Sequence, residues 1–167
     1  MAAALIEFVL PKCRSIILEH EMDASRYTLS NFKVATTSGS YDVIAGVQWM
    51  GADLLVGICG GEKPHIGAVA IAESRPSLAD PDRTSATASV FCFVGHKEDE
   101  LAKATAERLA KTLQTHVVVA AGIHWDDISK EGIQKIMDNC GQLVELILEK
   151  IATEFPATIN SEDIQGQ

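Results

Sequence analysis

Apolar and polar residues alternate through much of the first half of the chain. From Val43 to Trp49 every second residue is apolar, which is typical of a strand with one buried face. Residues 50–53 have turn composition and residues 54–59 are again apolar, so the two segments predict a hairpin. A second turn at Gly60 and Gly61 precedes the apolar run 66–72.

A polar segment separates this run from another alternating stretch. Residues 73–84 contain Pro76, Pro81 and several charges, which favours a loop over a helix. In residues 85–94, by contrast, both alternating sets include apolar side chains, with Cys92 and Val94 on one face and Phe91 on the other. A strand with apolar residues on both faces is typical of the middle of a sheet, so we predict a central strand here.

The period changes to that of a helix after residue 97. Acidic residues fill positions 98–100, where they complement a helix N-terminus, and leucine or threonine then recurs every fourth residue from Leu101 to Leu113. Residues 116–123, mostly apolar and with a run of β-branched valines, predict a short buried strand. Ser129 is the predicted N-cap of a final helix, whose apolar face continues to Ile151.

Consecutive strands followed by helix, strand and helix predict an α+β fold. We expect a mainly antiparallel β-sheet with two helices packed on one face, in which the last strand can add one parallel pairing. Residues 41–155 are predicted to form this single domain. Residues 1–40 are predicted to be an N-terminal extension with one or two edge strands, at 14–21 and 27–34, and residues 156–167 a disordered tail.

Composition and charge narrow the class of partner. The chain has 167 residues and a formal net charge of −9, which argues against binding duplex nucleic acid or an anionic membrane surface. No uncharged apolar run approaches the roughly 20 residues that a membrane-spanning helix needs. The four cysteines form no CxxC pair, which favours reduced thiols and a cytoplasmic location.

Candidate chemistry lies at the ends of the predicted strands. The polar side chains concerned are His65, Arg75, Arg83, Thr84, Ser85, His96, Lys97 and His124. If strands 66–72 and 85–94 are antiparallel neighbours, the two arginines lie at one end of the sheet and His65 and His96 at the other. A two-fold dimer can bring the two groups together.

Each of these residues has a simpler interpretation beside the functional one. Arg75 and Arg83 can bind one phosphate or carboxylate together, or pair with the acidic residues of their own loop. The helix N-terminus near His96 and Lys97 can bind an anion, although the acidic residues 98–100 oppose this. His65, His96 and His124 can bind a divalent metal, although no HxH or HxxxH spacing supports that.

Familiar enzymatic patterns are missing from the sequence. Thr84 and Ser85 have no GxSxG context, and no GxGxxG or P-loop pattern is present. The residues alone therefore assign no catalytic residue and no metal ligand.

Several longer motifs resemble one small bacterial family. They are Pro64-His65-Ile66-Gly67-Ala68-Val69-Ala70, Arg75-Pro76-Ser77-Leu78, Asp80-Pro81-Asp82-Arg83-Thr84-Ser85-Ala86-Thr87, Gly95-His96-Lys97-Glu98-Asp99-Glu100-Leu101 and Val118-Val119-Ala120-Ala121-Gly122-Ile123-His124. From about residue 53 to residue 151 the chain resembles the D-type accessory proteins of gallate decarboxylase, which are also described as prenylated-flavin chaperones.

The resemblance implies a non-enzymatic accessory protein. It would bind prenylated flavin mononucleotide (FMN), or FMN itself, and deliver it to a UbiD-type non-oxidative hydroxyarylic acid decarboxylase that works with a flavin prenyltransferase. Arg75, Arg83 or Lys97 would then contact the phosphate, and His65, His96 and His124 would supply polar donors. A weaker likeness to proteasome-assembly-chaperone domains, which act as dimers, implies a homodimer.

Two other functions remain open on the sequence. The protein can be an assembly factor that contacts the decarboxylase through protein surfaces alone. It can also be a small enzyme that uses a metal bound by the three histidines.

Overall fold

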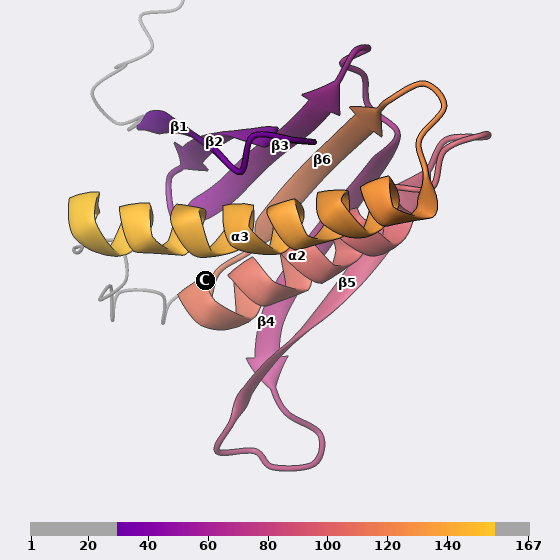
Figure 1. The fold of residues 1–167 in the computed structure, drawn as a ribbon. Helices are drawn as coiled ribbons and strands as arrows, with labels where there is room; N and C mark the ends of the chain where they lie inside the picture. The colour runs from indigo at the N-terminus through magenta and orange to yellow at the C-terminus, as the bar shows by residue number, and fades with distance from the viewer. Residues whose placement is uncertain (1–29, 156–167) are drawn as a thin grey trace, which may run out of the picture.

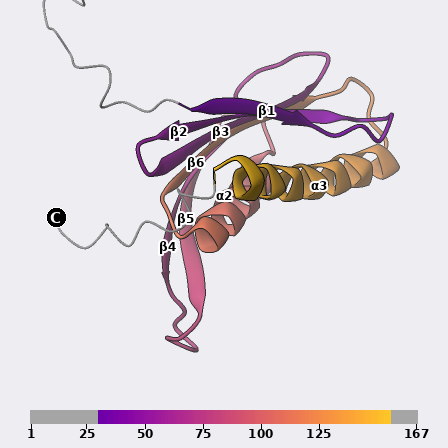
Figure 2. The same ribbon diagram turned by 90° about the vertical axis from the view of Figure 1, so that its left-hand side faces the viewer.

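The computed structural model describes residues 30–155, which form one six-stranded sheet and two helices (Figure 1). The strands are β1 (Asn31–Ala35), β2 (Val43–Met50), β3 (Asp53–Gly61), β4 (Ala68–Pro76), β5 (Thr84–Cys92) and β6 (Val117–His124). The helices are α2 (Asp99–Leu113) and α3 (Lys130–Glu154). Within the described residues both helices lie on the same face of the sheet, as the side view in Figure 2 shows.

The sheet has the strand order β1-β2-β3-β6-β4-β5. Strands β1, β2 and β3 form an antiparallel meander, and β4 and β5 form a hairpin. Strand β6 inserts between them, parallel to β3 and antiparallel to β4. The predicted α+β class, with a mainly antiparallel sheet and one parallel pairing, is therefore confirmed.

The core lies between the sheet and the two helices. Alternate residues of β2, from Val43 to Trp49, are at most 4% exposed, as their spacing predicts. Helix α2 packs over β4, β5 and β6, whereas α3 packs over β1 and β2. Leu109 and Ile147 are fully buried from the helix side. Burying this shared apolar face is the main favourable contribution to folding.

The prediction of a central strand at residues 85–94 was wrong, because β5 is an edge strand of the sheet. Its pairing with β4 places Phe91 opposite Val69, on the face that no described helix covers. Phe91 is 62% exposed and the neighbouring Phe93 is 47% exposed. The alternating pattern correctly indicated apolar residues on two faces, but it could not tell whether both faces are covered.

Both predicted helices are present, and α2 begins at Asp99, one residue later than the pattern predicts. The hydroxyl of Ser129 accepts a hydrogen bond from the backbone N–H of Gly132 at 3.1 Å, so this residue is the N-cap of α3. The apolar face of α3 is buried from Cys140 to Ile151. Its first turns differ, since Ile133 and Met137 are 51% and 44% exposed. These turns lie beside the loop that follows β6, where both line the candidate site described below.

The N-terminal extension contributes one described strand. The strand expected at 27–34 appears as β1, an edge strand whose Phe32 ring stacks on Phe155 at 5.7 Å. The strand expected at 14–21 and the tail 156–167 lie outside the described residues, and the domain limits stay predictions. No helix within residues 30–155 is long and apolar enough to cross a membrane.

Candidate functional site

The sheet divides the eight predicted site residues into two groups of four. Arg75 pairs in register with Ser85 at the far end of the β4–β5 hairpin, next to Thr84 and close to Arg83. His65, His96, Lys97 and His124 lie at the opposite end, where β3 and β6 finish. The nine residues of β4 separate the groups by about 30 Å. One phosphate therefore cannot contact both groups in a single chain, as the antiparallel pairing predicts.

The arginine end is held mainly by local hydrogen bonds. The guanidinium of Arg75 donates to the Thr87 hydroxyl and to the carbonyl of Pro76. The Thr84 hydroxyl accepts from the side chain of Gln114 at 3.0 Å. Within residues 30–155, neither Arg75 nor Arg83 has a carboxylate within 4.0 Å, so the ion pairs that we considered in this loop do not form there.

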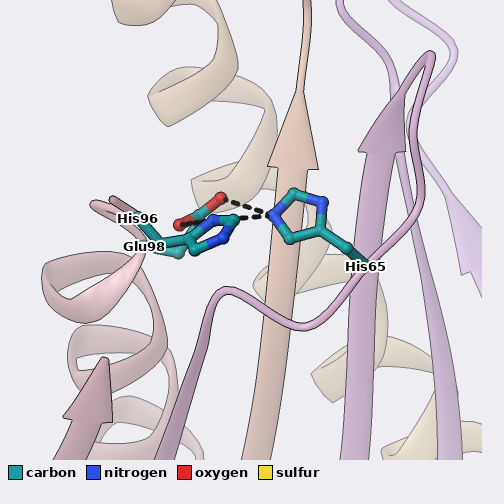
Figure 3. A group of neighbouring side chains, drawn as sticks. All are labelled: His65, His96 and Glu98. Atoms are coloured by element: carbon teal, nitrogen blue, oxygen red, sulfur yellow. Dashed lines mark hydrogen bonds and ion pairs between the residues drawn. The ribbon is translucent and has the colours of Figure 1, made fainter. Parts of the chain in front are cut away.

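At the other end, His65 and His96 meet a carboxylate (Figure 3). Nε2 of His65 lies 3.0 Å from Nδ1 of His96 and 3.3 Å from Oε1 of Glu98. Nδ1 of His96 lies 3.6 Å from Oε2 of the same carboxylate. The side chain of Glu98 is only 11% exposed, whereas those of the two histidines are 23% and 34% exposed. The site is thus a small, half-buried cluster, which we call the His65–His96–Glu98 cluster.

Two glycines create the space for this cluster. A Cβ on Gly122, in β6, would lie 2.0 Å from the backbone oxygen of His65, and one on Gly67 would lie 2.4 Å from Oε2 of Glu98. The backbone N–H of Gly67 donates to the carbonyl of Ala121 at 2.9 Å, which holds the loop before β4 against the end of β6. The missing side chains therefore let the loop approach closely enough to place His65.

The sequence analysis missed Glu98 as a site residue. The pattern places positions 98–100 together in the first turn of a helix, but α2 begins at Asp99, and Glu98 is its half-buried N-cap residue. Its carboxylate accepts from the backbone N–H groups of Lys97 at 2.9 Å and Ile123 at 3.2 Å. These donors are therefore engaged by Glu98 rather than free for a phosphate. The close-packed glycines were the available signal, but the sequence pattern places Gly67 only within the apolar run 66–72.

The surroundings of Glu98 keep its carboxylate ionised. Burial opposes the charge, but the backbone N–H groups of Ile123 and Lys97 and the nearby His65 favour it, and the net effect lowers the pKa of Glu98 below 4.5. A carboxyl whose pKa is lower in the folded state stabilises the fold above pH 4.5 and loses this contribution as the pH falls through the lowered value.

We therefore expect Glu98→Gln to flatten the acid side of the stability profile. The wild-type free energy of unfolding should fall more steeply than that of the variant between about pH 5 and pH 3, because only the wild type must protonate this carboxyl. Urea unfolding at a series of pH values measures the difference. Glu107→Gln, on a half-buried position of α2 away from the cluster, is the control and should follow the wild type. Parallel profiles for Glu98→Gln and wild type would contradict the prediction.

His124 belongs to a neighbouring polar group. Its Nε2 lies 2.8 Å from Oδ1 of Asp126, and the same carboxylate pairs with the Nζ of Lys63 at 2.9 Å. The hydrogen bonds from Lys63 and His124 hold the pKa of Asp126 below its usual value. The His124 ring stands edge-on to that of His65 with centroids 6.3 Å apart. His124 therefore lines the site, while its polar contact is to Asp126.

A pocket of about 460 Å³ opens beside these residues. His96, Lys97 and His124 line its polar side. Apolar side chains from the end of β6, the following loop and the first turns of α3 form the remaining wall: Ile123, Trp125, Ile128, Ile133, Ile136 and Met137. The rings of Trp125 and Tyr41 pack edge to face, with centroids 5.3 Å apart. This volume and mixed lining are typical of small-molecule sites, and Lys97, whose side chain pairs with no carboxylate among the described residues, adds positive charge at the mouth.

Comparison with a solved structure gives a distant likeness. The chain is similar to one from a chaperone complex for yeast 20S proteasome assembly, with a TM-score of 0.43 and 10% sequence identity. The similarity covers 69% of this chain and 98% of the other.

Comparison with protein sequences and families is more informative. The chain is 30% identical over 98 residues to Protein LpdD of Lactiplantibacillus plantarum, a match that covers 59% of this chain and 68% of the relative. Residues 37–152 match the family model of the prenylated flavin chaperone LpdD-like domain, and this range includes all eight predicted site residues and Glu98. The chain therefore belongs to the prenylated flavin chaperone LpdD-like family.

Proposed function

We propose that this protein binds prenylated FMN in the pocket beside His96 and Lys97 and delivers it to a UbiD-type hydroxyarylic acid decarboxylase. In this proposal it acts as a carrier and leaves the flavin chemically unchanged. Membership of the flavin chaperone family supports the ligand class. The observation that carries the proposal is the pocket, which combines an apolar wall with imidazole and ammonium groups at one end of the sheet.

The residues of the pocket fit the chemistry of the flavin. The tricyclic ring system needs apolar contact, which Ile123, Trp125 and Ile136 supply. The phosphate needs a cation or hydrogen-bond donors, and Lys97 and His96 lie at the same pocket. A volume of about 460 Å³ lies within the range of roughly 300–1,000 Å³ that ligand sites usually have.

Binding of the flavin is the first test. We expect the purified protein to bind reduced prenylated FMN under anaerobic conditions, and Lys97→Ala to weaken the affinity by about tenfold, since a charge-assisted phosphate contact contributes roughly 1.5 kcal/mol or more. Absorbance and fluorescence titrations measure both. Lys111→Ala is the control, because Lys111 is exposed in the last turn of α2, the helix that Lys97 precedes, and does not line the pocket. Equal affinities for the two variants would place the phosphate elsewhere.

Delivery is tested with the decarboxylase partner. Flavin-loaded protein should activate the apo-decarboxylase faster than the same amount of free prenylated FMN, and chromatography should recover the flavin unaltered. The competing interpretation is an assembly factor that acts by protein contact alone. In that case His65→Ala and Arg75→Ala would restore decarboxylase activity in cells as well as the wild type does.

We also propose that the protein is a homodimer formed through the open face of the sheet. Ile71 and Phe91 are 58% and 62% exposed on this face, and Phe93 packs edge-on against Phe91 with centroids 5.0 Å apart. Such an exposed apolar patch is typical of a protein interface. A second copy is the favoured occupant because it can bring Arg75 and Arg83 near the pocket that one chain keeps about 30 Å away.

Substitution on this face should change the oligomeric state. We expect Ile71→Lys to shift the protein from dimer to monomer in sedimentation velocity without unfolding it, since residue 71 is exposed and the new charge would be buried only in a dimer. Leu78→Lys is the control, because Leu78 is 91% exposed in the loop beyond the sheet. A wild-type protein that stays monomeric at high concentration would exclude the dimer, and with it a contact between Arg83 and the flavin.

A further inference from the structure

The His65–His96–Glu98 cluster brings three potential metal ligands together from distant parts of the chain. One ligand atom from each residue can be chosen so that all three lie within 4.8 Å of one another. His65 comes from the loop between β3 and β4, whereas His96 and Glu98 precede α2. No local motif such as HxH creates this arrangement. It depends on the pairing of β4 with β6, which brings residue 65 to the end of β6.

The spacing of the ligand atoms matches a tetrahedral ion. The distances between donors are 3.0 Å for the two imidazole nitrogens and 3.3 Å and 3.6 Å from these nitrogens to the carboxylate oxygens. In a tetrahedral zinc site with bonds of about 2.0–2.1 Å, neighbouring ligand atoms lie about 3.4 Å apart. The distances of 3.0 Å and 3.3 Å, which share Nε2 of His65, lie close to this value, and the 3.6 Å distance runs to the other oxygen of Glu98.

The hydrogen bond on the outer nitrogen of His65 also favours metal binding. Its Nδ1 lies 2.8 Å from the backbone carbonyl of Lys63. Because a carbonyl oxygen can only accept, Nδ1 carries the proton in this contact, so Nε2 is the ring nitrogen that can offer a lone pair to a metal. A backbone carbonyl on the outer nitrogen is a common partner of histidines that bind metals, since it fixes the tautomer and the ring orientation.

Backbone hydrogen bonds also orient the carboxylate of Glu98 for metal binding. Backbone N–H groups of Lys97 and Ile123 hold Glu98 in place and leave lone pairs on both oxygens. Two neutral imidazoles and one ionised carboxylate are a ligand set that zinc and ferrous iron both accept, and the near-tetrahedral spacing favours zinc. Without a metal, one proton shared between the two imidazole rings accounts for the 3.0 Å contact.

We propose that His65, His96 and Glu98 bind one zinc ion and leave its fourth position open. Since His96 and Glu98 also line the pocket, we infer that the open position takes an anionic oxygen of the bound ligand, such as its phosphate. This second statement rests on the proposed function. The metal site itself does not, because it follows from the three side chains alone.

Metal binding is tested on the full-length protein without any flavin. After removal of metal with a chelator, calorimetric titration with Zn²⁺ alone should show one site per chain, and Co²⁺ alone should give the intense visible absorption of a tetrahedral complex. His65→Ala and the nearly isosteric Glu98→Gln should each weaken the affinity at least about 100-fold. Circular dichroism of the variants establishes that they remain folded.

A histidine away from the site provides the matched control. His116 pairs with Asp53 at 3.2 Å at the opposite end of the sheet. His116→Ala should therefore bind Zn²⁺ as the wild type does. The proposal is overturned if Glu98→Gln keeps the wild-type affinity, or if the wild type binds no Zn²⁺ at micromolar concentration. The second result would support the shared proton.

A final titration separates this proposal from the proposed function. FMN should bind the zinc-loaded protein more tightly than the zinc-free protein, and inorganic phosphate should change the Co²⁺ spectrum. Zinc binding without any flavin binding would support the metal site and overturn the flavin carrier. Flavin binding of equal strength with and without zinc would support the carrier and overturn the role of the open position.

Discussion

Gly122→Ala should be among the most damaging single substitutions in this protein. The added methyl group would lie 2.0 Å from the carbonyl oxygen of His65 and 2.6 Å from its carbonyl carbon. Both atoms belong to backbone, so relief requires the loop before β4 to move away from β6. We expect the free energy of unfolding to fall by at least about 2 kcal/mol, as overpacking at a buried site commonly does.

The same substitution should remove the functional site. Moving the His65 backbone separates its imidazole from His96 and Glu98, so Zn²⁺ and flavin binding should both be lost even where the variant remains folded. Gly57→Ala is the matched control. Gly57 also lies in a central strand, but a Cβ there has no atom within 4 Å. Urea unfolding and Zn²⁺ titration of the two variants measure the contrast, and a Gly122→Ala protein with wild-type stability and affinity would disprove this account of the loop.

Asn139→Leu should have a comparable effect on stability through a different mechanism. Asn139 is 1% exposed and donates hydrogen bonds to the carbonyls of Ser40 and Tyr41 at 3.0 Å and 2.7 Å. Its side-chain oxygen accepts from the hydroxyl of Ser38 at 2.9 Å. Leucine would leave these part-buried groups without their partner, and each lost hydrogen bond or unsatisfied polar group costs about 1–3 kcal/mol.

The position of Asn139 adds a functional consequence. It ties α3 to the loop between β1 and β2, and the turns of α3 just before it form part of the pocket wall. We expect Asn139→Leu to lower the free energy of unfolding by about 2–3 kcal/mol and to weaken flavin binding. Gln134→Ala is the control, since Gln134 is exposed on the same helix and bonds only to Asp138 among the described residues. A loss of less than about 0.5 kcal/mol in urea unfolding would contradict this assignment.

The sequence predicted the elements better than their neighbours in the sheet. Strand β2, helix α2 and the Ser129 cap follow from residue periods and local hydrogen bonding, which act over a few positions. The order of strands in the sheet depends instead on which strands pair across long stretches of chain, such as β6 with β3 and β4. For this reason the alternating pattern of β5 predicted a central strand, although β5 lies at the edge.

The candidate site shows the same division. His65, His96 and His124 were predicted as site residues because they follow or precede strands, and they do lie at one end of the sheet. Glu98 was not predicted, because it appears in the sequence as one of three acids at a helix start. Its role depends on a contact with the loop before β4, about 30 residues earlier in the chain.

The sequence by itself determined the α+β class, the two amphipathic helices and the set of cationic and imidazole residues available for binding an anion, because these depend on residue type and short-range period. Only the tertiary structure decided which of those residues meet. Pairing of β6 between β3 and β4 sends the arginines to one end of the sheet and joins His65, His96 and Glu98 at the other. The physical reason is that close contact between distant segments depends on backbone packing, here at Gly67 and Gly122, which has no period along the chain.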